Sequence, residues 1–163
     1  MKKIFYLLLI CMVSFAACTE EQAKDALEGL EDFYEGNVKP TCETNINKTE
    51  NQIVGTAIFK AASLEMCNVK IVADFVMSQS PTSASGAPVK LCSQCVMTER
   101  FATEKMAMAA WAKFAVADKK LASLSGTTIT VNLTSDVEGM DYNAMELFVQ
   151  QMLDNLKKTM TFE

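Results

Sequence analysis

The stretch CVMTERFATEKMAMAAWAKFAVADKKLASL, Cys95–Leu124, shows the strongest helical periodicity in the chain and decides the predicted fold class. Its apolar residues form two stripes at helical spacing, one being Met106, Ala110, Phe114, Ala117, Leu121 and Leu124, the other Phe101, Met108, Trp111 and Ala115. A helix that is apolar nearly all round is typical of the centre of a domain. We therefore expect this helix, with Trp111 and Phe114 buried, to be the centre of the fold.

Helices are also predicted over Thr19–Tyr34 and from about Asp141 to Met160, one on each side of the central stretch. The first begins with capping-box spacing and carries one apolar stripe. The second has an apolar face at helical period, formed by Met145, Phe148, Val149, Met152, Leu156 and Met160. Both segments therefore have a face that can pack against a central helix.

The segment from Thr44 to Ser78 fits both a helix and a strand. Lys60–Met66 contains no Gly or Pro and favours helix, whereas residues 69–77 alternate and are rich in β-branched side chains. We expect helix through about Met66, which then continues or changes to strand. Residues 127–133 alternate cleanly and predict a strand, and residues 69–77 are the best candidate for its partner.

These elements predict a mainly α fold, a helical bundle around Cys95–Leu124 with a small β element. The alternative is an α+β fold with strands near 69–77 and 127–133. A signal peptide is expected over residues 1–17, followed by one mostly helical domain over 18–163. Its 146 residues are enough to form a single core.

The first residues have the pattern of an export signal. Lys2 and Lys3 precede a short apolar run, and small residues come before Cys18. The sequence Ser14-Phe15-Ala16-Ala17-Cys18 resembles the lipobox of bacterial lipoproteins, with Phe15 where that family usually has Leu. The resemblance covers residues 1–18 only. It implies that Cys18 becomes the lipid-modified N-terminus of an exported cell-envelope or outer-membrane lipoprotein.

Cysteine parity agrees with this interpretation. Five cysteines remain after residue 17, and lipid on Cys18 leaves an even number of thiols. We expect these four, Cys42, Cys67, Cys92 and Cys95, to form structural disulfides, as exported proteins commonly do. The competing interpretation is cleavage by an ordinary signal peptidase and a secreted, extracellular, disulfide-stabilised helical protein that binds a small apolar ligand.

Only one motif has evident redox chemistry. Cys92-Ser93-Gln94-Cys95 has the CxxC spacing of thiol-disulfide proteins, so a redox protein using Cys92 and Cys95 is an alternative function. The chain has no histidine, which removes His-activated nucleophiles and His metal ligands. No metal site is predicted because Cys42 and Cys67 stand alone rather than in a second close-spaced pair. We assign no catalytic residue and no cofactor.

Net charge limits the partners. The formal charge of −5 becomes −7 once Lys2 and Lys3 leave with the signal, which disfavours nucleic acid and electrostatic attachment to anionic lipid. The leading prediction is a non-enzymatic binding or interaction module, held on the membrane by lipid on Cys18. Its partner is expected to be a protein or a small apolar ligand; a purely structural envelope lipoprotein is a further alternative.

Overall fold

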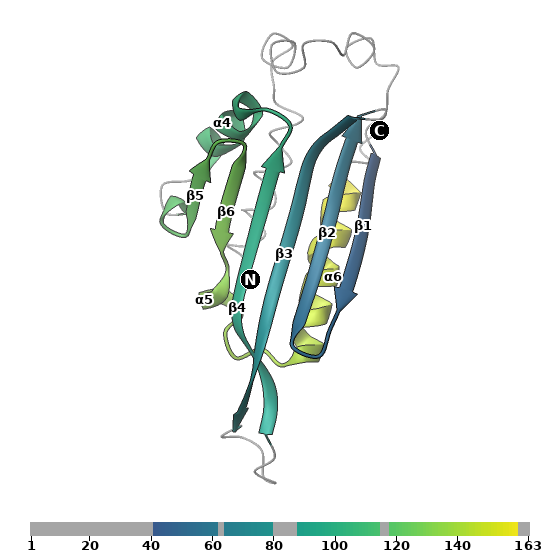
Figure 1. Cartoon of the computed structure of the whole chain (residues 1–163), viewed down its shortest axis with the longest axis vertical. Helices are drawn as coiled ribbons and strands as arrows, with labels where there is room; N and C mark the ends of the chain where they lie inside the picture. The colour runs from purple at the N-terminus through teal and green to yellow at the C-terminus, as the bar shows by residue number, and fades with distance from the viewer. Residues whose placement is uncertain (1–40, 62–63, 80–87, 115–117, 160–163) are drawn as a thin grey trace.

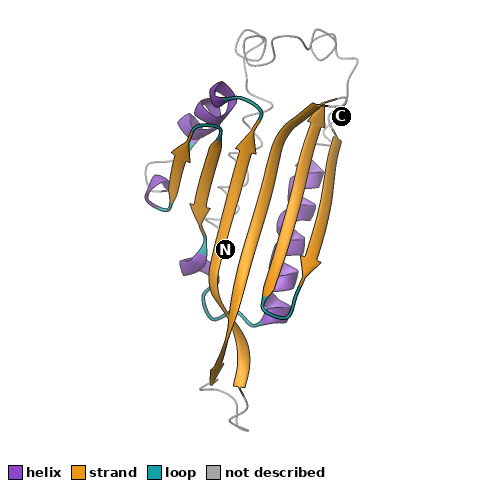
Figure 2. Ribbon diagram, in the orientation of Figure 1, coloured by secondary structure: helices purple, strands orange, loops and turns teal. Residues whose placement is uncertain are grey.

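The protein is built around one antiparallel sheet (Figures 1 and 2). The computed structural model describes residues 41–61, 64–79, 88–114 and 118–159. Within these residues the sheet has six strands, in the order β1-β2-β3-β4-β6-β5. They are β1 Thr41–Lys48, β2 Gln52–Ala61, β3 Leu64–Gln79, β4 Pro88–Phe101, β5 Ala122–Ser125 and β6 Thr128–Asn132. The helices are α4 Glu104–Lys113, α5 Thr134–Val137 and α6 Tyr142–Thr159, with the 3₁₀ turn η1 at Asp118–Lys120.

The prediction of a helical bundle is wrong. The alternative α+β prediction placed strands near 69–77 and 127–133, and β3 and β6 cover these positions. These two strands are not paired with each other, because β4 lies between them. The expected helix Thr19–Tyr34, the signal peptide and Cys18 lie outside the described residues.

The central prediction, a helix over Cys95–Leu124, fails at both ends. Residues 95–101 belong to β4, and β5 begins at Ala122. The helix between them, α4, starts where the Thr103 hydroxyl accepts a hydrogen bond of 3.2 Å from the Met106 N–H. Phe114 is buried as expected, but Trp111 is only half-buried, with the Lys119 ammonium group 5.2 Å from its ring centre. This helix is therefore peripheral.

The two faces of the sheet differ in burial, and β2 shows the difference most clearly. Every second residue from Ile53 to Ala61 is buried, and every residue between them is partly exposed. The partly exposed set includes Val54 and Ile58, so β2 carries apolar side chains on both faces. That composition also places apolar residues three and four apart, which is why the sequence of this strand resembles a helix.

The buried face of the sheet packs against α6, which lies behind β1 and β2 in the view of Figure 1. The predicted helix over 141–160 is confirmed, and its buried residues are Met145, Val149, Met152, Leu153 and Leu156. Asp141 begins this helix by accepting a hydrogen bond of 2.8 Å from the Ala144 N–H. The same core continues over β3, β4 and β6 and includes residues of α4 and α5.

Candidate functional site

The four cysteines of the described chain are free thiols, which corrects the prediction of disulfides for Cys42, Cys67, Cys92 and Cys95. The register explains why two of them stay apart. Phe59 on β2 pairs with Cys42 on one side and with Cys67 on the other. Two strand spacings separate these cysteines by about 9–10 Å, and a disulfide requires Cα atoms within about 7 Å.

The CxxC motif lies inside β4 at an irregularity of the strand pairing. Cys92 pairs with Phe75 and Cys95 pairs with Ala73, so the extra residue Ser93 turns both thiols to the buried face. The backbone N–H groups of Cys92 and Cys95 are hydrogen-bonded to the segment that follows β6. The Cys92 N–H donates to the Met140 carbonyl at 2.8 Å, and the Cys95 N–H donates to Thr134 Oγ1 at 3.0 Å.

These surroundings oppose thiolate chemistry. Burial raises the pKa of Cys92, and burial with the neighbouring Cys92 and Asp74 raises the pKa of Cys95 to about 12. A nucleophilic thiol needs the opposite shift, which a helix N-terminus or a nearby cation provides. Cys92 and Cys95 instead lie in mid-strand. Among the described residues no group of His, Cys, Asp and Glu side chains is arranged to hold a metal ion.

The open face of the sheet, opposite α6, is a candidate binding surface. No described side chain on this face is buried, whereas its neighbours on the other face form the core. One row of polar side chains crosses all six strands in register: Asn45, Thr56, Lys70, Thr98, Thr130 and Ser123. The adjacent row has Val54, Val72 and Val96 at its centre, all partly exposed. The face therefore offers hydrogen-bonding groups beside a narrow apolar strip.

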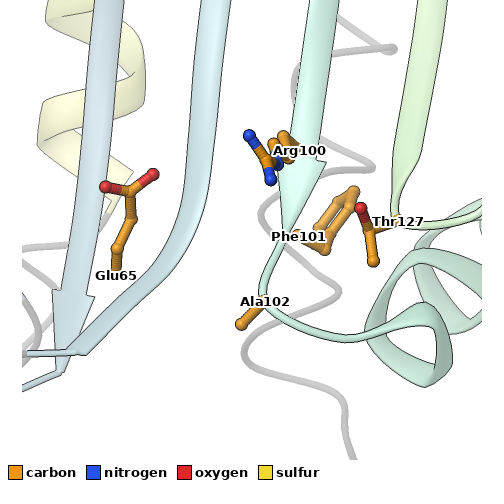
Figure 3. Close-up of a pocket in the computed structure, with 5 residues that line it drawn as sticks. All are labelled: Glu65, Arg100, Phe101, Ala102 and Thr127. Carbon is orange, nitrogen blue, oxygen red and sulfur yellow. The ribbon is translucent and has the colours of Figure 1, made fainter.

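A pocket of about 340 Å³ lies at one end of this face, and Figure 3 shows its lining. Its lining residues are Glu65, Arg100, Phe101, Ala102 and Thr127. The strand pairing builds the pocket. Between Phe59 and Lys60 the β2–β3 register shifts, so Met66 has no partner on β2 there, and β3 bends away from the end of β4.

Two opposite charges line the pocket. Arg100 on β4 is the only arginine of the chain, is exposed, and makes no ion pair or side-chain hydrogen bond within the described residues. Glu65 on β3 accepts a hydrogen bond of 3.1 Å from Asn68 Nδ2. Figure 3 shows Glu65 and Arg100 on either side of β3, with the guanidinium group directed toward that strand. No salt bridge joins them.

Sequence reasoning missed this site. Arg100 falls inside the predicted helix Cys95–Leu124, and no role was predicted for it. The one available signal was that Arg100 is the single arginine of the chain, because all other basic residues are lysines. In the sheet Arg100 lies opposite Asn68 of β3 and Thr128 of β6. The periodicity of the sequence does not show which strands are paired.

Comparisons with protein families, with curated proteins and with solved structures give no match to this chain. Within the described ranges, none of the helices has both the length and the apolar character needed to span a membrane.

Proposed function

We propose that this protein is a non-enzymatic binding module of the cell envelope, anchored by lipid on Cys18, and that it binds its partner on the open face of the sheet. One observation carries the proposal. On β2, β3 and β4 the side chains of one face are buried in the core, as the residues from Ile53 to Ala61 show on β2. The side chains of the opposite face are partly or fully exposed on all three strands.

An accessible face of this composition suits recognition. Partly exposed valines next to threonine hydroxyls provide both apolar contact and hydrogen bonds, as protein and ligand interfaces require. The charged lining of the pocket favours a polar partner group over the small apolar ligand expected from the sequence. The lipobox-like segment before Cys18 supplies the support for the anchor.

Site-specific photocrosslinking in the native host tests the binding surface. A photoreactive residue replaces Thr98 on the open face, and the matched control replaces Gln151, an exposed residue of α6. We expect a discrete adduct from position 98 and none from position 151. Absence of an adduct from position 98, or equal adducts from both positions, would overturn the proposal.

A further inference from the structure

The Arg100 pocket has an arrangement that points to one ligand chemistry. A guanidinium group presents several N–H donors in a planar fork that matches a carboxylate, and Arg100 uses none of them within the described residues. The Thr127 hydroxyl, another lining group, also makes no hydrogen bond there. Both groups are therefore available to an external acceptor.

The second charge of the pocket has the opposite sign. Asn68 Nδ2 donates to one oxygen of Glu65, which orients the carboxylate and leaves its other oxygen available to a cation. Asn68 is also the residue that pairs with Arg100 across β3 and β4. The amide thus lies between the two charges, which fits the absence of a salt bridge joining them.

We infer that this pocket binds a small zwitterion, namely a free amino acid or an unblocked dipeptide. Its carboxylate is bound by Arg100 and Thr127, and its ammonium group by Glu65. A volume of about 340 Å³ suits a ligand of this size. The inference rests on the proposed function, since Arg100 of the pocket lies on the open face, and it names the class of ligand.

The single arginine makes the test specific, because its side-chain Nε–H gives one arginine signal in an NMR spectrum of the full chain. The probes are the dipeptide Ala-Ala, its N-acetyl form and its C-terminal amide. We expect Ala-Ala to shift the Arg100 signal saturably, the N-acetyl form to bind more weakly, and the amide to bind at least about tenfold more weakly, since a charge-assisted hydrogen bond is lost.

Variants assign each charge. Arg100→Gln should weaken Ala-Ala binding about tenfold or more, read from the backbone amides of Ala102 and Thr127. Glu65→Gln should remove the preference for Ala-Ala over its N-acetyl form. The matched control is Lys70→Gln, which removes a cation on the same face outside the pocket and should leave both affinities unchanged.

The inference would be overturned by the absence of a saturable shift with Ala-Ala, by equal binding of the amide, or by unchanged binding to the Arg100→Gln variant. A preference for Ala-Ala that survives Glu65→Gln would also overturn it. If position 98 crosslinks but Ala-Ala does not shift the Arg100 signal, the proposed ligand class is wrong and the proposed binding surface stands. If Ala-Ala shifts the Arg100 signal but position 98 does not crosslink, the proposed function is wrong and the pocket still binds a zwitterion.

Discussion

Gly55 on β2 lies so close to α6 that a β-carbon at this position would be 2.5 Å from Cγ1 of Val149. Non-bonded carbon atoms do not approach this closely, and Cδ1 of Leu153 closes the same space at 3.3 Å. A glycine inside a strand often marks such a close approach. The contact fixes the distance between the sheet and the helix that covers it.

Gly55→Ala should therefore destabilise the fold by about 1–3 kcal/mol, because overpacking forces a stiff valine off its rotamer or moves α6. Urea unfolding measures the loss. In a Val149→Ala background the same change should cost less, since the obstructing methyl group is gone. Unchanged stability, or an equal loss in both backgrounds, would show that α6 does not lie against β2 in this way.

Neighbouring residues on β3 test the difference between the two faces. Ile71 is fully buried, and Ile71→Ala should cost about 2–5 kcal/mol by chemical unfolding. Val72 points to the open face and is only partly buried, so Val72→Ala should cost under about 1 kcal/mol. Similar losses at both positions would mean that both faces of the sheet are covered.

The buried thiol of Cys95 predicts a pH dependence. Its pKa rises from the ordinary 9.0 to about 12 in the folded chain, so the unfolded chain loses this proton first as pH increases. As the pH rises from 9.0 to about 12, the free energy of unfolding should decrease. This thiol contributes at most about 1.4 kcal/mol per pH unit to the decrease. The contribution is fully present below pH 9.

Comparison of the parent protein with Cys95→Ala isolates that contribution, because the other groups that titrate in this range are shared. The stability advantage of the parent should shrink as pH rises. An advantage that is constant or grows with pH would contradict the assignment. Alkylation of denatured, unreduced protein should also label all four thiols of the described chain.

The proposed anchor predicts a change of location. Cys18→Ala should abolish metabolic labelling with a fatty-acid analogue and release the protein from the membrane fraction, because no other acyl-bearing cysteine is proposed. Cys42→Ala, a cysteine change within the folded domain, is the control and should keep the label. A mature protein that begins at Ala17 and carries no acyl chain would disprove the anchor.

Part of this fold is predictable from local pattern. The strand at 127–133 and the helix at 141–160 stand out because most apolar residues of each lie on one face, at periods of two and 3.6, with Leu147 as an exposed exception. Residues 53–61 lack this clarity. Apolar side chains on both faces of β2 hide the alternation, and the absence of Gly and Pro near Lys60–Met66 conceals the turn into β3.

The prediction of a helix over Cys95–Leu124 was wrong for a different reason. Its alanines and methionines favour helix, and α4 does form at its centre, but residues 95–101 are held in the sheet by pairing with β3 and β6. Tertiary pairing of this kind overrides local propensity. The pocket was unpredictable for the same reason, since it unites the start of β3, the end of β4 and the turn before β6.

One face of the sheet maintains the fold, and we propose that the other face binds the partner. The most direct test is the yield of photocrosslinking from position 98 in a Val72→Asp variant. Val72 lies in the partly exposed valine row next to the row of Thr98, so we expect a variant that unfolds cooperatively and has lost the adduct. An undiminished adduct would show that the partner does not bind at this face, and a variant that fails to fold would show that this face is part of the core.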